Sequence, residues 1–259
     1  MNYDRLFDKS LSDNFIRFMD VEKCDIVLEV GCGNGMWTST ISTFFQNAVL
    51  IAADKNMKLV MDAQRSLSSS CINFVVCDAH HLPFVEGSFD LVTCRRLLMN
   101  LKRNRNALIE MKRVSRIGGV ICTVEPSFLD AIEYSTLPSE LRFNRRLLRL
   151  TSVHDGNVPD LGFGRKLPTQ FQLCGFNAID VMVMYVKMQY TGYGKSASDL
   201  HRSLESLERL SETADIDRST LKLLKEEASA IDKDRAEQMR LRRYLMWSAF
   251  PFIAVRANK

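Results

Sequence analysis

The sequence lacks paired CxxC cysteines, long apolar runs and a strong excess of charge of either sign. Its 259 residues include 35 basic and 31 acidic side chains, for a net charge of +4. So small an excess does not indicate a dedicated nucleic-acid binder, although a local basic patch remains open. No ordered Asp, Asn and His set indicates a metal-dependent enzyme either, so no metal is expected.

The sequence also has little that would direct it to a membrane or an oxidising compartment. No apolar stretch approaches the length of a membrane span, and the first 20 residues carry charges throughout without an apolar signal-peptide core. The seven cysteines are odd in number, and several fall in apolar runs that suit buried strands. We therefore expect a cytoplasmic protein in a reducing setting.

What is present is an alternation of short apolar runs and amphipathic stretches, in a chain that is 46% hydrophobic. Helical spacing is seen in residues 3–19, 35–45, 57–67 and 104–116, the last closed by Gly118-Gly119. The apolar runs that suit strands are 26–30, 48–53, 72–76, 89–94, 120–124, 178–186 and 252–255. This order predicts an α/β fold with a doubly wound, mostly parallel sheet.

The segment between the last two strands has a different pattern. Helical stripes follow Asp199 and Asp217, which predicts a helical insertion over residues 188–246. We expect an N-terminal helical segment over residues 1–24 and a main domain over residues 25–187 with 247–259. A helical cap is expected over residues 188–246.

The strongest local signal is the glycine-rich run that follows the first strand, Glu29-Val30-Gly31-Cys32-Gly33-Asn34-Gly35. Glycines between a buried strand and a helix let the backbone turn sharply and approach a ligand closely. The next helix directs its free N–H groups at the same place. Position 36 is Met, so the third glycine of the G-x-G-x-x-G dinucleotide fingerprint is missing, which disfavours a nicotinamide-dependent oxidoreductase.

Two acidic residues end the next two strands. Asp54 lies about twenty residues beyond the glycines, where an acid can accept hydrogen bonds from ribose hydroxyls, and Asp78 ends the third strand. The alternatives are a helix-capping acid at Asp54 and a plain turn residue at Asp78. Open α/β sheets bind ligands at this carboxyl edge, so the sequence predicts a nucleoside site there.

As an ordered set, these residues resemble the class I S-adenosylmethionine-dependent methyltransferases of the small-molecule type (methyltransferase-11/25-like). The resemblance rests on Val27–Gly35, Ala53-Asp54, Cys77–Phe84, Gly87–Val92, Arg113–Gly119 and Leu173–Phe176. It implies a seven-stranded Rossmann-like sheet with an antiparallel last strand, and S-adenosylmethionine as cofactor, with S-adenosylhomocysteine as product. The cofactor-binding residues expected from it are Glu29, Gly31, Cys32, Gly33, Gly35, Asp54, Lys55, Asp78, Ala79 and Arg95.

No catalytic residue can be named from a motif, because methyl transfer relies chiefly on alignment and exclusion of water. Glu125, which follows the fifth strand, is a weak candidate for a substrate contact, with a helix-capping acid as the alternative. His80 and His81 are candidates for a base or a metal pair, but the resemblance puts them near the adenine. His154, in an expected loop, is a further candidate.

The acceptor of the methyl group is open between several classes. A small molecule is the first reading, because the insertion and residues 126–160 are expected to cover the site. The Asn/Asp-Pro-Pro-aromatic tetrapeptide of adenine and glutamine methyltransferases is absent after the fourth strand. An RNA substrate would use basic residues in 142–149 and at Arg235, Arg240, Arg242 and Arg243, for which a solvated helix face is the alternative. A non-catalytic cofactor-binding partner subunit is the third reading, and the oligomeric state is not predicted.

Overall fold

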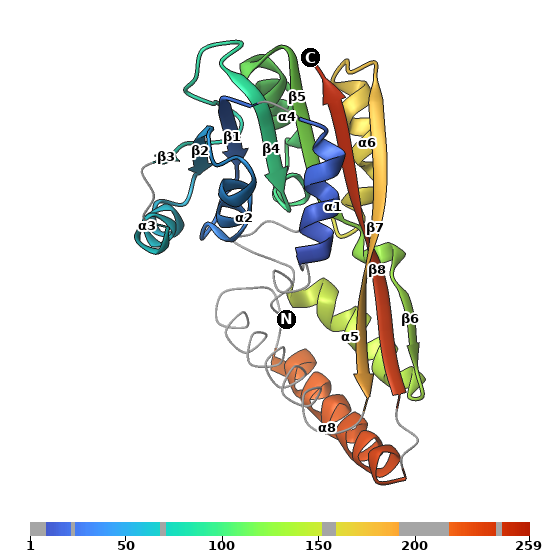
Figure 1. The fold of residues 1–259 in the computed structure, drawn as a ribbon. Coiled ribbons are helices and arrows are strands. Elements are labelled where there is room, and N and C mark those ends of the chain that lie inside the picture. The colour runs from blue at the N-terminus through green and yellow to red at the C-terminus, as the bar shows by residue number, and fades with distance from the viewer. Residues whose placement is uncertain (1–8, 22–23, 68–70, 152–158, 192–217, 242–244) are drawn as a thin grey trace. The chain divides into compact units, whose positions relative to one another are not determined.

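The computed structural model describes the chain except for residues 1–8, 22–23, 68–70, 152–158, 192–217 and 242–244 (Figure 1). The chain divides into two compact units. The sheet unit lies within residues 4–129, 160–184 and 251–259, and the second unit contains residues 130–159 and 185–250. The three-part division predicted from the sequence stays a prediction.

The sheet unit is a doubly wound α/β fold. Its strands are β1 (Ile26–Val30), β2 (Val49–Asp54), β3 (Ile72–Val76), β4 (Phe89–Arg95), β5 (Ser115–Pro126), and parts of β7 (Ile179–Thr191) and β8 (Leu245–Asn258). They follow the order β3-β2-β1-β4-β5-β8, with β7 paired to β8. β1 to β5 are parallel and β8 is antiparallel to β5, which confirms the predicted fold class.

The helices of this unit are α1 (Lys9–Met19), α2 (Met36–Phe44), α3 (Met57–Ser66), α4 (Asn104–Val114) and α6 (Phe163–Leu173), with short helical turns at η2 (Leu98–Asn100) and η3 (Phe128–Asp130). The central strands are buried almost throughout, as in β4, where six of seven residues are buried. Helix-covered parallel strands lose contact with water on both faces, which explains their continuous apolar sequences.

The predicted helix over 104–116 is too long by two residues. It ends at Val114, and Ser115 is already extended and pairs with Phe89 of β4. The register then shifts before Leu91, and a Cβ at Gly119 would lie 2.6 Å from the Ser115 Oγ. Gly118 and Gly119 thus belong to an irregular start of β5 rather than to a helix end, because a side chain would collide at Gly119 and the positive φ of 76° favours glycine at Gly118.

The second unit contains elements that the sequence analysis did not foresee or placed only in part. It holds β6 (Ile132–Ser135), α5 (Pro138–Thr151) and α8 (Arg218–Arg240), and β6 pairs antiparallel with residues 246–249 of β8. β6 is an eighth strand, added to the seven expected. α8 buries Leu224, Ala228 and Ile231 along one side, as the predicted stripe requires. The helix predicted after Asp199 lies outside the described residues.

A buried ion pair joins two helices of the second unit. Arg235 of α8 donates to the carboxylate of Glu140 of α5, and these side chains are 4% and 1% exposed. Glu140 also accepts from the Ser135 hydroxyl at 3.0 Å. In the part of the chain that the structure describes, no helix is long and apolar enough to cross a membrane.

Candidate functional site

The predicted site residues meet at one edge of the sheet. The parallel register aligns Val30 with Ala53 and Asp54 with Val76, and it aligns Arg95 with Val124. The carboxyl ends of β1 to β5 are therefore level. Such an edge is where open α/β sheets bind their ligands.

The loop between β1 and α2 is built from glycines in left-handed conformation, with φ of 78° at Gly31, 54° at Gly33 and 83° at Gly35. The N–H groups of Gly31 and Cys32 donate to the carbonyl oxygen of Ala53, at 2.7 and 3.0 Å. Residues with a Cβ rarely adopt these angles, so the glycines are required by the path of the chain.

The three glycines differ in the space around them. A Cβ at Gly31 would lie 2.8 Å from Leu97 Cδ1, and one at Gly35 would lie 2.8 Å from Leu67 Cδ1 and 3.0 Å from Ala63 Cβ. A Cβ at Gly33 would meet nothing described within 4 Å. The backbone is thus open at Gly33, where a ligand can approach it closely.

Asp54 fixes the glycine loop. One carboxylate oxygen accepts from the Gly33 N–H and the other from the Asn56 N–H, both at 2.9 Å. A carboxylate has about four acceptor sites, so these two bonds leave capacity for the hydroxyls of a ribose. Neighbouring Lys55 is exposed.

Asp78 organises the turn that follows β3. Its Oδ1 accepts from the backbone N–H of His80 at 2.8 Å and lies 2.5 Å from His80 Nδ1. These hydrogen bonds lower the pKa of Asp78. Ala79 is buried, whereas His81 is exposed. His80 therefore acts as a partner of Asp78 within the turn.

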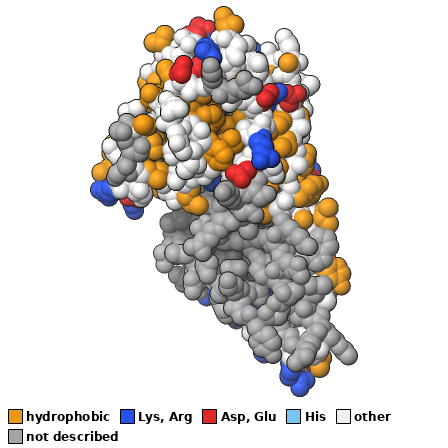
Figure 2. Space-filling model, in the orientation of Figure 1, with side chains coloured by type: hydrophobic (Ala, Val, Ile, Leu, Met, Phe, Trp, Pro, Cys, Tyr) orange, Lys and Arg blue, Asp and Glu red, His pale blue; other side chains and the backbone are white. Residues whose placement is uncertain are grey.

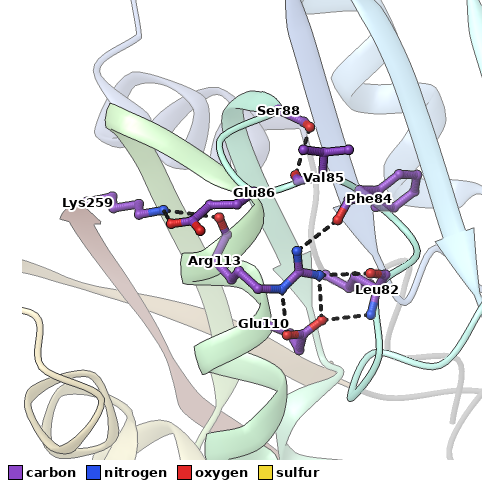
Figure 3. A network of polar contacts seen from close by, with 8 residues as sticks. All are labelled: Leu82, Phe84, Val85, Glu86, Ser88, Glu110, Arg113 and Lys259. Carbon is purple, nitrogen blue, oxygen red and sulfur yellow. Dashed lines mark hydrogen bonds and ion pairs between the residues drawn. The ribbon is translucent and has the colours of Figure 1, made fainter.

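A network of charges holds the end of the same loop (Figure 3). Arg113 donates to the carbonyls of Leu82 and Phe84 and to both carboxylate oxygens of Glu110, at 2.8–2.9 Å. Glu110 accepts in turn from the Leu82 N–H at 2.9 Å. These hydrogen bonds lower the pKa of Glu110, and α4 thereby holds the segment that follows Asp78.

Glu29 lies in the core beneath the loop. It is 1% exposed, and its Oε2 accepts from the Thr38 hydroxyl at 2.6 Å. Burial raises its pKa to about 7, against a lowering by this hydrogen bond and by Arg95. The Arg95 guanidinium lies 5.7 Å from the ring centroid of Trp37, which is also buried. Cys32 is likewise packed in the core, beside Ala52 and Val60, so only its backbone belongs to the loop surface.

Glu125 is fully buried at the end of β5. Its Oε1 accepts from the backbone N–H groups of Leu97 and Leu98, at 2.9 and 2.7 Å. Its Oε2 has no hydrogen-bond partner within the described part of the chain. Burial raises the pKa of Glu125 to about 7, against a lowering by these N–H groups. The carboxyl group thus faces the turn after β4.

The basic residues considered for RNA have varied surroundings. Arg235 is buried in the ion pair with Glu140, and Arg146 pairs with Glu227. Arg142 and Arg240 are exposed. On the face drawn in Figure 2, the coloured charged side chains lie in small groups of both signs. His154, Arg242 and Arg243 lie outside the described residues.

Three contributors to this edge went unrecognised in the sequence. Leu97 covers Gly31, Thr38 binds Glu29, and the Glu110–Arg113 pair holds the loop after Asp78. The spacing of three residues between Glu110 and Arg113 on a helix indicates that they can pair, but it does not indicate that they bind the loop after Asp78. Among described residues, no group of three or more His, Cys, Asp or Glu side chains is arranged to hold a metal ion.

Part of the sheet unit is similar to known proteins. Residues 28–123 match the family model described as "Methyltransferase domain". Over 124 residues the chain is 30% identical to an uncharacterized methyltransferase of Schizosaccharomyces pombe, covering 44% of each chain. It is 35% identical over 112 residues to the demethylmenaquinone methyltransferase of Staphylococcus epidermidis, covering 42% of this chain and 46% of the relative. The matches thus span less than half the length of these relatives.

Solved structures share the fold at low identity. The BH2331 protein of Bacillus halodurans matches with a TM-score of 0.63 and 16% identity, covering 96% of this chain and 99% of that one. The phosphoethanolamine N-methyltransferase 2 of Haemonchus contortus, solved with phosphomonomethylethanolamine and S-adenosylhomocysteine, matches with a TM-score of 0.53 and 17% identity. The second match covers 99% of this chain and 56% of that one.

Proposed function

We propose that this chain, whose residues 28–123 belong to the class I methyltransferase domain family, transfers a methyl group from S-adenosylmethionine to a small molecule. The observation that carries the proposal is the open backbone at Gly33 beside the Asp54 carboxylate. It supports a ligand that brings a ribose to Asp54 and lies against bare backbone. Asp78 and buried Ala79 would bind the adenine side.

When bound, S-adenosylmethionine supplies a methyl group on a positively charged sulfur, which is transferred by in-line displacement. The residues of the chain bind the cofactor and the acceptor, orient them toward each other and exclude water from the site. Alignment of this kind can contribute about 7–11 kcal/mol to the lowering of the barrier. A base is needed only where the acceptor arrives protonated, and neither Glu125 nor His80 is assigned that role.

Two comparisons support a small-molecule acceptor. The matched demethylmenaquinone methyltransferase and phosphoethanolamine methyltransferase are both named for small acceptors. A reduced demethylmenaquinone and phosphoethanolamine are therefore the first compounds to assay.

The decisive experiment is calorimetric titration with S-adenosylhomocysteine and with NAD. We expect heat of binding with the first and none with the second, and the reverse would overturn the proposal. Labelled methyl groups from S-adenosylmethionine should then enter a low-molecular-weight fraction of a cell extract. If the label enters RNA instead, the alternative acceptor holds. Uptake by RNA should then fall in Arg142→Glu but not in Arg65→Glu, a matched change at an exposed position of α3.

A further inference from the structure

The turn after β4 contains a strained residue. Arg96 has a φ of 55°, and it is one of two described non-glycine residues with positive φ. Left-handed backbone at such a residue is unfavourable and persists only where its surroundings hold it. Here the Arg96 N–H donates to the Val124 carbonyl at 3.1 Å, and the Arg96 carbonyl accepts from Asn100 Nδ2 at 2.7 Å.

Glu125 holds the next two residues of the same turn. Its Oε1 takes both N–H groups that follow Arg96, those of Leu97 and Leu98. A buried carboxylate with one unpartnered oxygen is costly, and in a folded protein it calls for an explanation. The strained turn that it stabilises supplies one.

The turn determines where the Leu97 side chain lies. Leu97 fills the place that a Cβ at Gly31 would occupy, with its Cδ1 2.8 Å from that point. The sheet order is β3-β2-β1-β4. Asp78 follows β3 and Asp54 ends β2, whereas Gly31 follows β1 and Leu97 follows β4. Asp54 therefore lies between Asp78 on one side and Gly31 and Leu97 on the other. If the ribose binds at Asp54 and the adenine toward Asp78, Leu97 and Gly31 would face the amino-acid end of the cofactor.

We propose that Glu125 is a positioning residue, which holds the 96–98 turn so that Leu97 forms the pocket wall at the amino-acid end of the cofactor. This inference rests on the proposed function. It assigns Glu125 no proton transfer and no contact with the ligand. Loss of Glu125 should therefore affect a ligand that carries the amino-acid part more than one that lacks it.

The experiment compares S-adenosylhomocysteine with 5′-methylthioadenosine, which lacks the amino-acid part, by calorimetry on the full chain. In Glu125→Ala we expect the affinity for S-adenosylhomocysteine to fall about tenfold or more, as for loss of hydrogen bonds to a charged group. The affinity for 5′-methylthioadenosine should fall less than about threefold. Glu125→Gln keeps an oxygen for the two N–H groups, and it should recover most of the loss.

Thr123→Val is the matched control. Thr123 lies two residues earlier on β5, is fully buried, and its hydroxyl has no hydrogen-bond partner among the described residues. Its change should leave the ratio of the two affinities unaltered. Leu97→Ala tests the wall directly and should lower the affinity for S-adenosylhomocysteine selectively, even where Glu125→Ala fails to fold.

Equal weakening of both ligands in Glu125→Ala and Leu97→Ala, or no change in either variant, would overturn the inference while leaving the proposed function intact. If the wild-type chain binds neither ligand, the proposed function itself fails. The two failures are therefore distinguishable.

Discussion

The N–H of Gly33 donates to the carboxylate of Asp54 at 2.9 Å, and this bond ties the open point of the glycine loop to the end of β2. The second oxygen of Asp54 is engaged by the Asn56 N–H, at the start of α3. The same carboxylate thus sets the shape of the loop and is available to a ribose.

Asp54→Asn should weaken binding of S-adenosylhomocysteine by about 10- to 100-fold, since one of two charge-assisted acceptors becomes a donor. Titration calorimetry measures this loss. Asp62→Asn, a change at a half-buried residue of α3 that pairs with Arg65, is the control and should bind as the wild type does. An unchanged affinity in Asp54→Asn would contradict the role given to this carboxylate.

Gly35→Ala should destabilise the fold more than Gly118→Ala. Both glycines have positive φ, 83° and 76°, so both changes introduce similar backbone strain of about 1 kcal/mol. Only at Gly35 does the new Cβ collide with Leu67 and Ala63. Urea denaturation should therefore show that the free energy of unfolding falls by about 1–3 kcal/mol more in Gly35→Ala than in Gly118→Ala. Equal losses in the two variants would show that α3 gives way.

Arg113→Ala should release the loop that follows Asp78. It removes the donors to the carbonyls of Leu82 and Phe84 and leaves Glu110 without its guanidinium partner. Because these groups are partly exposed, we expect a loss of about 1–3 kcal/mol in urea denaturation, with faster amide exchange over residues 79–88. Arg65→Ala, which breaks an exposed pair with Asp62, should cost less than about 1 kcal/mol.

Glu29 should make the stability of the protein depend on pH. Its pKa in the folded chain is about 7, above the ordinary value of 4.5, so between these values the folded state binds more protons than the unfolded state. Stability therefore falls as pH rises from about 5 to 7 and levels off above. Glu125 acts in the same direction, whereas the lowered pKa values of Asp78 and Glu110 act below this window.

Glu29→Gln keeps an oxygen for the Thr38 hydroxyl and removes the ionisation. The slope of unfolding free energy against pH between 5 and 7 should fall to about half, because Glu125 still contributes. Urea titrations at four pH values measure it. Identical slopes in the wild type and Glu29→Gln would mean that Glu29 does not titrate in this range.

Much of the sheet unit was determined by local sequence. The strands at Ile26–Val30 and Ile72–Val76 begin and end where predicted, because a continuous apolar run bounded by Gly or polar residues has few other ways to be buried. The glycine loop could also be predicted from the sequence, because its positive φ angles favour glycine over other residues and so leave a glycine-rich pattern. Asp54 and Asp78 followed from the rule that parallel strands share a carboxyl edge.

Tertiary structure alone decided which side chains meet there. Leu97 lies against Gly31, and Glu125 reaches the N–H groups of Leu97 and Leu98, across separations that no local pattern encodes. The β6 strand is four residues long and exists through its pairing with β8, and the true end of α4 depends on the pairing of Ser115 with Phe89. Periodicity records which face of an element is buried, whereas partners distant in sequence are set by the packing of whole elements.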